Sequence, residues 1–219
     1  MCGRYNLAQV DQVAARFGVA DAQAELQPRY NVAPSQAMPV VVRNSPNRLV
    51  AMQWGLIPAW SKEPRAQFST INARAETVAT SGLFRGPFKS RRCLVPANGF
   101  YEWRKLAQGK QPYCIQLLGG ELFAFAGLYD IWRDRDGSEL YSYTIITTAP
   151  NELVAPIHNR MPAILRREDE QVWLDQSADP LRLTSLLSAY PADAMEAYPV
   201  SRALNNPANE GPELLQAAA

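Results

Sequence analysis

Apolar residues recur at two different spacings along the chain, and each spacing predicts a different kind of element. Near the start, apolar side chains fall three or four positions apart, as on one face of a helix, and Gly18 follows where a C-terminal cap belongs. This pattern predicts a helix over residues 7–17. Farther along, short apolar runs lie between clusters of Gly, Pro, Asn and Ser, which is typical of strands joined by turns. Such strands are expected at residues 38–43, 49–54, 92–96, 99–105, 113–117, 122–131, 141–148, 163–165 and 197–200.

The close succession of these strands favours antiparallel pairing. Residues 44–47 supply the turn of one hairpin, and residues 29–35 are expected to form a loop. Helices are expected at residues 167–174, after an acidic start, and at residues 180–189, with a proline in the first turn. The predicted fold class is therefore α+β and predominantly antiparallel β, with strands around a central core and helices at the periphery.

Length and composition predict a single domain. With 219 residues, of which 47% are hydrophobic and 20% charged, the chain can bury one sizeable core. We place this core at residues 2–205 and a C-terminal segment at residues 206–219, whose last residues, 217–219, are expected to be loose. No apolar run approaches the roughly 20 residues of a membrane span, and no leader pattern is seen. A cytoplasmic protein without membrane contact is expected.

The charge balance excludes a large basic surface. Twenty-two basic and 21 acidic residues leave a formal net charge of +1, so any nucleic-acid site must be a local patch. One such patch lies at residues 85–92, where Arg85, Lys89, Arg91 and Arg92 occur without an acid. The alternative is an ordinary solvated basic loop.

The cysteine and histidine positions argue against a disulfide framework and a zinc site. Three cysteines stand far apart, which favours a reducing compartment. Cys93 and Cys114 lie in apolar strand-like contexts and are expected in the core. Together with Cys2 and His158 they lack the short ligand spacings of structural zinc sites. Phosphate-binding glycine loops and Gly-x-Ser-x-Gly are also absent, so neither a metal nor another cofactor is expected.

Cys2 becomes an unusual chemical group if Met1 is removed, because the new terminus is then a free 1,2-aminothiol. An α-amine with a reference pKa of about 7.7 to 8.0 stands beside a thiol of about 8.5, so both act as nucleophiles near neutrality. The amine condenses with an aldehyde to an imine, and the thiol closes onto the same carbon to form a five-membered ring. The alternative is that Cys2 is an ordinary residue of a frayed terminus.

Aldehyde capture also needs an acid or base near the aminothiol. Alternation within residues 99–104 places Glu102 on the face opposite Tyr101 and Trp103, in an otherwise apolar strand. Partial burial there raises the pKa of a carboxyl group towards the working range of a base. A surface ion pair of Glu102 with Arg104 or Lys105 is the alternative.

His158 is the only histidine, and it lies beside Arg160 in a segment bracketed by Pro156 and Pro162. Loops held by rigid flanks often gather acid, base and anion-binding residues. The sequence leaves open whether His158 has such a role or a structural one.

Two further segments offer contacts for a nucleic acid. Asn72 and Arg74 share one face if residues 70–77 form a strand, where an amide directs a hydrogen bond and a guanidinium suits a phosphate. The same residues need no function if they precede a helix at Glu76. In the irregular loop 54–60, an exposed Trp60 would stack on an unpaired base, whereas packing beneath the loop is the alternative.

Six motifs occur in a fixed order along the chain. They are Met1-Cys2-Gly3-Arg4, Arg29-Tyr30-Asn31-Val32-Ala33-Pro34, Trp54-Gly55-Leu56-Ile57-Pro58, Ile71-Asn72-Ala73-Arg74-Ala75-Glu76-Thr77, Gly99-Phe100-Tyr101-Glu102-Trp103 and His158-Asn159-Arg160-Met161-Pro162. This order resembles that of the SRAP family, the SOS response-associated peptidase or abasic-site processing proteins. The resemblance runs from Cys2 to the region of Asn205 and Asn206, which is essentially the whole chain.

The resemblance implies one mainly β domain with a groove for single-stranded DNA. In it, the mature N-terminal cysteine forms a thiazolidine with the ring-opened aldehyde of an abasic site and protects the lesion during replication. By matching motif positions, Cys2 is implied as the nucleophile and Glu102 as the group that assists imine formation and ring reversal. His158 is implied as the partner of the sugar oxygen, and Asn72 as the residue that orients the sugar or the terminus.

The implied DNA contacts come from six residues outside that catalytic set. Phosphate contacts are expected from Arg4, Arg74 and Arg160, and further DNA contacts from Pro34, Trp60 and Arg85. The implied partner is single-stranded DNA with abasic sites, bound by a monomer that associates with the nucleoid. Since every abasic site carries an aldehyde, the chemistry supplies selectivity and the contacts can ignore base sequence.

Two alternatives and two departures accompany this hypothesis. The first alternative is a cysteine-type autopeptidase that acts at Met1, and the second is a non-enzymatic DNA-binding module built on the basic patch. Ser61 follows Trp60 where some relatives carry a second aromatic residue, which predicts a weaker wedge. With Met1 retained, the nitrogen of Cys2 is an amide and no imine can form.

Overall fold

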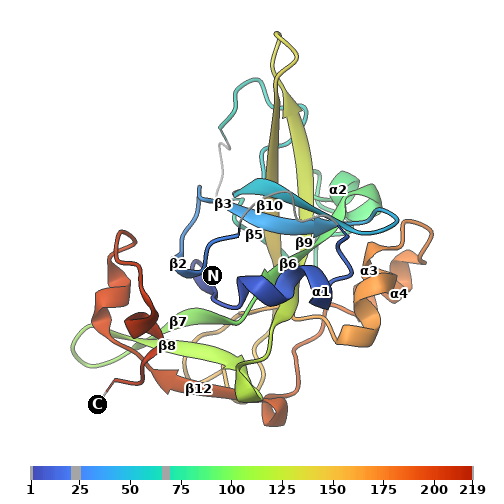
Figure 1. Ribbon diagram of the computed structural model, residues 1–219. Helices are drawn as coiled ribbons and strands as arrows, with labels where there is room; N and C mark the ends of the chain where they lie inside the picture. Colours follow the sequence, from blue (N-terminus) through green and yellow to red (C-terminus); the bar gives the residue numbers. More distant parts are fainter. Residues whose placement is uncertain (1, 21–25, 66–69, 219) are drawn as a thin grey trace.

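A small closed β-barrel forms the centre of the protein. The structure is a computed structural model that describes residues 2–20, 26–65 and 70–218 (Figure 1). In the barrel, β4 pairs with β10 in parallel, and the other neighbours are antiparallel, with the β9–β10 pair closing the ring. The barrel strands are β3 (Ala37–Val42), β4 (Arg48–Trp54), β6 (Arg92–Ala97), β9 (Phe123–Arg133) and β10 (Glu139–Thr148). Two short strands extend it beside β10: β5 (Asn72–Arg74) and β11 (Met161–Pro162).

The barrel strands are apolar because most of them are covered on both faces. Every residue of β6 is buried, so its sequence is a continuous apolar run after Arg92. On β9, a Cβ atom at Gly127 would approach Cys93 Sγ and Val95 Cγ2 to 2.8 Å each. Glycine at this position therefore permits the close approach of β6 and β9.

A second, antiparallel sheet carries the N-terminal strand. Its order is β12, β8, β7, β1, β2, which places β1 between β7 and the edge strand β2. The bounds are β1 (Tyr5–Leu7), β2 (Arg29–Val32), β7 (Gly99–Lys105), β8 (Lys110–Leu117) and β12 (Met195–Pro199). This sheet lies below the barrel in Figure 1.

Aromatic side chains join the second sheet to the barrel. The ring centroid of Tyr5 on β1 lies 5.2 Å from the ring centroid of Trp54 and 5.9 Å from that of Phe125. Its hydroxyl group lies 2.7 Å from that of Tyr143, so both buried hydroxyls are hydrogen bonded. A smaller apolar cluster on the other face of the sheet contains Tyr101, Cys114, Val200, Leu204 and Leu214.

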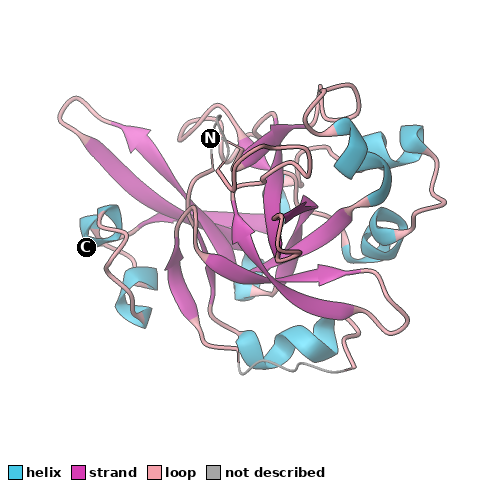
Figure 2. Cartoon of the chain, turned by 90° about the horizontal axis from the view of Figure 1, so that it is seen from above, coloured by secondary structure: helices cyan, strands magenta, loops and turns pink. Residues whose placement is uncertain are grey.

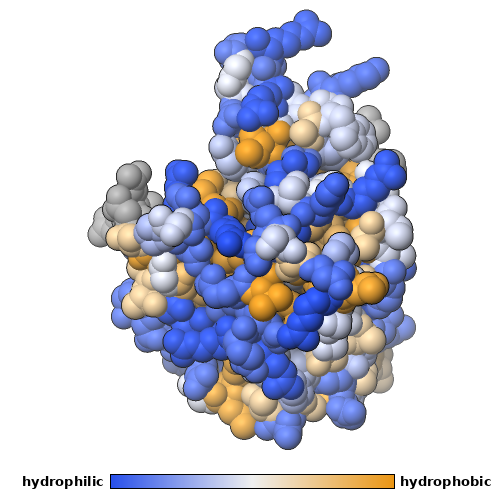
Figure 3. All heavy atoms as spheres, turned by 90° about the vertical axis from the view of Figure 1, so that its right-hand side faces the viewer, coloured by the Kyte–Doolittle hydropathy of each residue, from blue (hydrophilic) through white to orange (hydrophobic). Residues whose placement is uncertain are grey.

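Short helices lie around the sheets (Figure 2). The α-helices are α1 (Val13–Arg16), α2 (Arg85–Ser90), α3 (Glu170–Leu174) and α4 (Pro180–Ser185). The 3₁₀ helices are η1 (Val10–Gln12), η2 (Leu118–Gly120), η3 (Arg167–Asp169), η4 (Ala192–Ala194), η5 (Arg202–Asn205) and η6 (Pro212–Leu215). Helices α2, α3 and α4 lie on the right in Figure 1, and the face seen from that side is mostly hydrophilic with scattered apolar side chains (Figure 3). Of the helices in the described ranges, none has the length and apolar content needed to cross a membrane.

The predicted fold class is confirmed, and most predicted strands occur within three residues of their expected ends. The helix predicted over residues 7–17 is wrong in its first part, because Tyr5–Leu7 forms a strand and helical structure covers only residues 10–16. The loop expected at residues 29–35 begins instead with β2. The strand expected at residues 163–165 is reduced to a bridge of Ile164 with Phe125, and α4 ends at Ser185 rather than at residue 189.

The C-terminal tail departs from the prediction, whereas the two internal cysteines agree with it. Ala217 forms a β-bridge with Val200, and the backbone N–H of Ala218 donates to Pro199. The expected loose tail is therefore attached as far as Ala218, and residue 219 lies outside the described residues. Cys93 and Cys114 are buried free thiols, as predicted.

Candidate functional site

Strand β1 brings Cys2 to the strand that carries Glu102. Tyr5 pairs with Phe100 in antiparallel register, and the N–H of Tyr101 donates to the carbonyl of Arg4 at 3.0 Å. Continuing this register places the residues before Arg4 alongside Glu102. Cys2 is fully buried, and its Sγ lies 3.6 Å from the carbonyl oxygen of Arg4.

The thiol of Cys2 is neutral in this environment. Burial raises its pKa well above the usual range, and the nearby charge of Glu102 raises it further. Since the thiolate is the nucleophile, reaction at Cys2 requires a base that removes the thiol proton. Glu102 is the carboxyl group whose field reaches this thiol.

Glu102 has the properties of such a base. Its side chain is 3% exposed, and burial raises its pKa to about 7. Its Oε1 atom is buried and has no hydrogen-bond partner among the described residues. The alternative of a surface pair with Arg104 or Lys105 is excluded by this burial. The predicted alternation is confirmed, because Tyr101 and Trp103 contribute to the small cluster on the opposite face.

His158 lies against the same carboxyl group. Its Nδ1 is 3.7 Å from Glu102 Oε1, and the backbone N–H of Arg160 donates to this nitrogen at 3.2 Å. Burial lowers the pKa of His158, so the ring is neutral at pH 7. The same nitrogen lies 3.2 Å from the carbonyl oxygen of Arg160, so the contacts of Nδ1 are compatible with either neutral tautomer. The loop itself is fixed by the N–H of His158, which donates to Val154 at 2.9 Å.

Asn72 lies on β5, one of the short strands beside β10. Its Nδ2 donates to the carbonyl of Ile145 at 3.4 Å. Its Oδ1 is buried and, within the described ranges, has no hydrogen-bond partner. An unpaired buried acceptor is costly, so this atom suits a donor from a ligand.

Arg160 links the histidine loop to β10 and to Glu76, which lies two residues after β5. Its Nη2 donates to Thr147 O at 2.6 Å and to Glu76 Oε2 at 2.9 Å, while Nη1 pairs with the other oxygen of Glu76. Hydrogen bonding from Arg160, together with its charge, lowers the pKa of Glu76. Glu76 was not among the predicted site residues, although it stands in the same motif as Asn72 and Arg74.

Trp60 and Pro34 lie on loops outside the sheets. Trp60 is 71% exposed, so the alternative of packing beneath the loop is wrong. Its loop is nevertheless anchored, because the N–H of Ala59 donates to Asp130 at 3.0 Å and the indole of Trp132 donates to Ser61 at 2.9 Å. Pro34 precedes Ser35, a residue with a positive φ of 72°.

The four arginines that were predicted to contact DNA lie in different surroundings. Arg74 and Arg85 are exposed and open to solvent. Arg160 is engaged by Glu76, and Arg4 donates to Asn31 Oδ1 at 2.6 Å and to Leu204 O at 3.0 Å. The structure thus brings Cys2, Glu102 and His158 together and links the strand of Asn72 to them through β10 and Arg160.

The basic patch at residues 85–92 is not one solvated loop. Residues 85–90 form helix α2, and Arg91 pairs with Asp130 at 3.1 Å. Arg92 is buried, and its guanidinium donates to four backbone carbonyls, those of Phe88, Lys89, Trp173 and Asp175. Arg92 is therefore a structural residue, because packing and not solvent surrounds its charge.

The arrangement contains no grouping that resembles a metal site. Among the residues that the structure describes, no three His, Cys, Asp or Glu side chains gather in a way that could hold an ion. The chemistry that the site can support is proton transfer between Glu102, His158 and a group bound beside Cys2.

Comparison with known proteins gives a consistent result. The family described as SOS response associated peptidase (SRAP) matches residues 1–207. The abasic site processing protein YoqW of Bacillus subtilis is 47% identical over 222 residues, which cover 99% of each chain. The abasic site processing protein HMCES of Gallus gallus is 36% identical and matches 88% of this chain and 67% of its own length. A crystal structure of a Bacteroides thetaiotaomicron protein superimposes over 100% of both chains with a TM-score of 0.90 and 32% identity. The chain therefore belongs to the SRAP family.

Proposed function

We propose that this protein, once Met1 is removed, captures abasic sites in single-stranded DNA as a thiazolidine on Cys2. The observation that carries the proposal is the position of a neutral buried thiol beside a carboxyl group with a pKa of about 7, which in turn contacts His158. Membership of the SRAP family, with relatives named abasic site processing proteins, supports DNA carrying such sites as the substrate.

The reaction balances with the groups at the site. The freed amine of Cys2 attacks the aldehyde carbon of the ring-opened sugar, and the carbinolamine loses water to give an imine. Glu102 takes the thiol proton, sulfur forms a bond to the imine carbon, and the ring nitrogen receives a proton. The products are a thiazolidine and one water molecule, with no oxidant or cofactor required.

The other side chains bind and orient the substrate in this proposal. Neutral His158 forms a hydrogen bond through Nε2 with the hydroxyl group of the opened sugar. Asn72 Oδ1 accepts from the substrate or from the new terminus, which satisfies its unpaired acceptor. Arg74 and Arg160 meet phosphates, and Trp60 stacks on an unpaired base next to the lesion.

The experiment uses the processed protein and a single strand with one abasic site. We expect an adduct that survives heating, is lost in Cys2→Ser and persists in Cys114→Ala, which changes another buried thiol. A strand with a tetrahydrofuran residue at the same position has no aldehyde and must form no adduct. Absence of an adduct with the parent protein rules out the proposal.

The autopeptidase alternative is favoured by the family description and by the same pair of residues. It predicts that Glu102→Gln retains Met1 when the protein is produced without methionine aminopeptidase, whereas the parent loses it. Intact mass of the two proteins decides between self-processing and removal by the host.

A further inference from the structure

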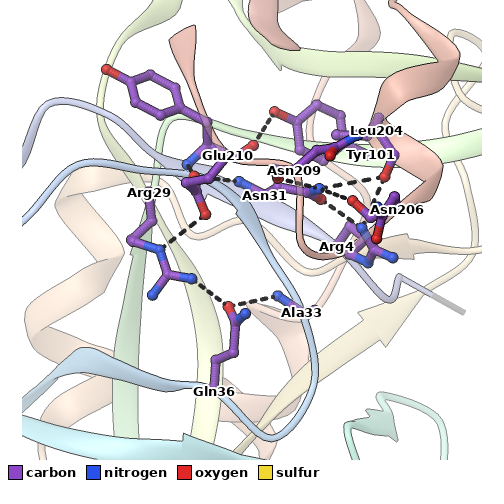
Figure 4. A network of polar contacts seen from close by, with 11 residues as sticks. Arg4, Arg29, Asn31, Ala33, Gln36, Tyr101, Leu204, Asn206, Asn209 and Glu210 are labelled. Atoms are coloured by element: carbon purple, nitrogen blue, oxygen red, sulfur yellow. Dashed lines mark hydrogen bonds and ion pairs between the residues drawn. The ribbon is translucent and has the colours of Figure 1, made fainter.

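The residue two positions after Cys2 is attached to a distant part of the chain. Arg4 Nη1 donates to Leu204 O at 3.0 Å and Nη2 donates to Asn205 O at 3.4 Å, contacts between residues some 200 positions apart. We name residues 204–210 the C-terminal clasp. Figure 4 shows four residues of the clasp near Arg4 and Asn31, namely Leu204, Asn206, Asn209 and Glu210.

Asn31 is the centre of the clasp contacts. Its side chain is fully buried, and its Oδ1 accepts from Arg4 at 2.6 Å. Its Nδ2 donates to the carbonyls of Asn206 at 3.0 Å and Asn209 at 2.9 Å. Because one side supplies a donor and the other supplies two acceptors, the amide, with one acceptor oxygen and two N–H donors, satisfies both.

Glu210 attaches the clasp to the edge strand of the sheet. Its carboxylate accepts from the backbone N–H groups of Tyr30 and Asn31 and from Arg29 Nε, the last at 3.1 Å. Among the described residues, strand β2 pairs with a strand on one side only, so N–H groups on its open edge would otherwise face solvent. The carboxylate of Glu210 accepts hydrogen bonds that a neighbouring strand would otherwise accept at this edge (Figure 4).

The same network reaches both residues that flank Glu102. The N–H of Tyr101 donates to the carbonyl of Arg4, and the Tyr101 hydroxyl donates to Tyr30 O at 2.6 Å. The indole N–H of Trp103 donates to Asn205 Oδ1 at 2.7 Å. Arg4 thus contacts the clasp through its side chain and the strand of Glu102 through its backbone.

We propose that the clasp positions Cys2 against Glu102, with Asn31 and Glu210 as positioning residues that act through Arg4. This inference rests on the proposed function for its effect on adduct formation. It assigns Arg4 to holding the terminus, because its guanidinium is occupied by Asn31 and two carbonyls rather than presented to a phosphate. A displacement of about 1 Å at a reacting group can lower a rate by about 100-fold, so loss of the clasp must slow the reaction.

The test compares Asn31→Ala and Glu210→Gln with matched controls. Asn47→Ala removes another buried amide that donates to a backbone carbonyl, that of Phe17 at 2.9 Å, and Glu213→Gln removes a charge three positions after Glu210. Two rates are measured at one temperature. They are adduct formation at saturating abasic strand and alkylation of each cysteine by iodoacetamide, read by peptide mass spectrometry.

The two rates must move in opposite directions if the clasp positions Cys2. Asn31→Ala and Glu210→Gln slow adduct formation by about 10-fold or more. They accelerate alkylation of Cys2 by about 10-fold or more, because exposure opens its thiol to the reagent and lowers the pKa that burial had raised. Buried Cys93 and Cys114 report global unfolding and keep their parental rates, as do all three thiols in the controls.

The outcomes separate this inference from the proposed function. Parental rates of both reactions in the two clasp variants overturn the inference, and so does equal acceleration at all three cysteines. If the parent forms no adduct but Cys2 alone is alkylated faster in the variants, the proposed function fails and the positioning role stands. If Asn31→Ala does not fold, Glu210→Gln decides by the same criteria, since it keeps the shape of the side chain.

Discussion

The imidazole Nδ1 of His158 lies 3.7 Å from Oε1 of Glu102, inside a site where burial shifts the two pKa values in opposite directions. Burial raises the pKa of the carboxyl group and lowers that of the imidazole, because it disfavours the charged form of each. At neutral pH the pair therefore consists of a neutral histidine and a carboxyl group that is close to half ionised. A pair of this kind can accept one proton and donate another without building up net charge.

The rate of adduct formation is expected to rise as pH increases through about 7, where Glu102 ionises. Glu102 acts as the base for the thiol of Cys2, so only its ionised form is active. Glu102→Gln should lower the rate at pH 8 by about 100-fold or more, a usual value for a general base. Single-turnover rates between pH 5 and 9 test this.

The variant profile supplies the control for this pH dependence. In Glu102→Gln the rise in rate near pH 7 must vanish, so that only the ionisation of the terminal amine still changes the rate with pH. An unchanged step near pH 7 in the variant would show that another group is responsible for it.

Trp60→Ala should weaken DNA binding with little change in stability. The side chain is 71% exposed, so its removal changes the free energy of unfolding by less than about 0.5 kcal/mol. Loss of one stacked base costs about 1–3 kcal/mol of binding free energy. Fluorescence anisotropy with a tetrahydrofuran-containing strand measures the affinity. Leu181→Ala is the matched control, because Leu181 is 79% exposed on α4, and equal affinities for the two variants would exclude the wedge role.

Glu76→Gln should tighten binding of single-stranded DNA severalfold at low salt. Glu76 forms an ion pair with the guanidinium group of Arg160, so its carboxylate competes with a phosphate for that group. The gain should shrink at high salt, because screening weakens the phosphate contact that Arg160 then makes. Glu168→Gln removes the same charge from η3 and should leave the affinity unchanged. Weaker binding by Glu76→Gln would mean that Arg160 serves only to hold the histidine loop.

The sequence predicted the strand of Glu102 well, because the relevant pattern is local. Residues 99–105 are expected and observed as a strand, and alternation alone separates Glu102 from Tyr101 and Trp103. The pKa shift follows from the same pattern, since a carboxyl group on the inner face of an apolar strand loses solvent. The aldehyde chemistry of Cys2 follows from its position after Met1, whereas the roles of Asn72 and His158 came from the family resemblance, because their motifs lie far apart along the chain.

Elements held by distant partners were missed. Leu7 fits the apolar spacing of a helix, but pairing of β1 with β7 and β2 makes a strand of residues 5–7. The clasp was also missed, since Asn206, Asn209 and Glu210 form a polar run that resembles a loose tail. Its order comes from Asn31 and Arg29, roughly 180 positions away, which no local pattern reports.

Arg92→Ala should destabilise the fold rather than weaken DNA binding alone. The guanidinium is buried and satisfies four backbone carbonyls, so its removal leaves acceptors unpaired between α2 and α3. Each buried carbonyl group that is left without a donor costs about 1–3 kcal/mol. Urea unfolding measures this, and Arg85→Ala on the exposed start of α2 is the control. Unchanged stability of Arg92→Ala would contradict the structural role of Arg92 and leave it as a member of the predicted basic patch.

Glu102→Gln should stabilise the fold above pH 7 although it slows the reaction. Burial raises the pKa of Glu102 from 4.5 to about 7, so the folded chain keeps a proton that the unfolded chain releases at lower pH. The contribution of Glu102 to the stability of the parent therefore falls as pH rises between these two values and is level outside them. The shift corresponds to a loss on the order of 3 kcal/mol, and glutamine does not titrate.

Urea unfolding of the parent and of Glu102→Gln at pH 5 and pH 8 measures this effect. The advantage of the variant should be small at pH 5 and greatest at pH 8. Glu168→Gln should show no pH-dependent difference from the parent. Equal stabilities of the parent and Glu102→Gln at pH 8 would mean that Glu102 is not desolvated in solution, and the carboxyl group would then lack the raised pKa that the proposed chemistry at Cys2 requires.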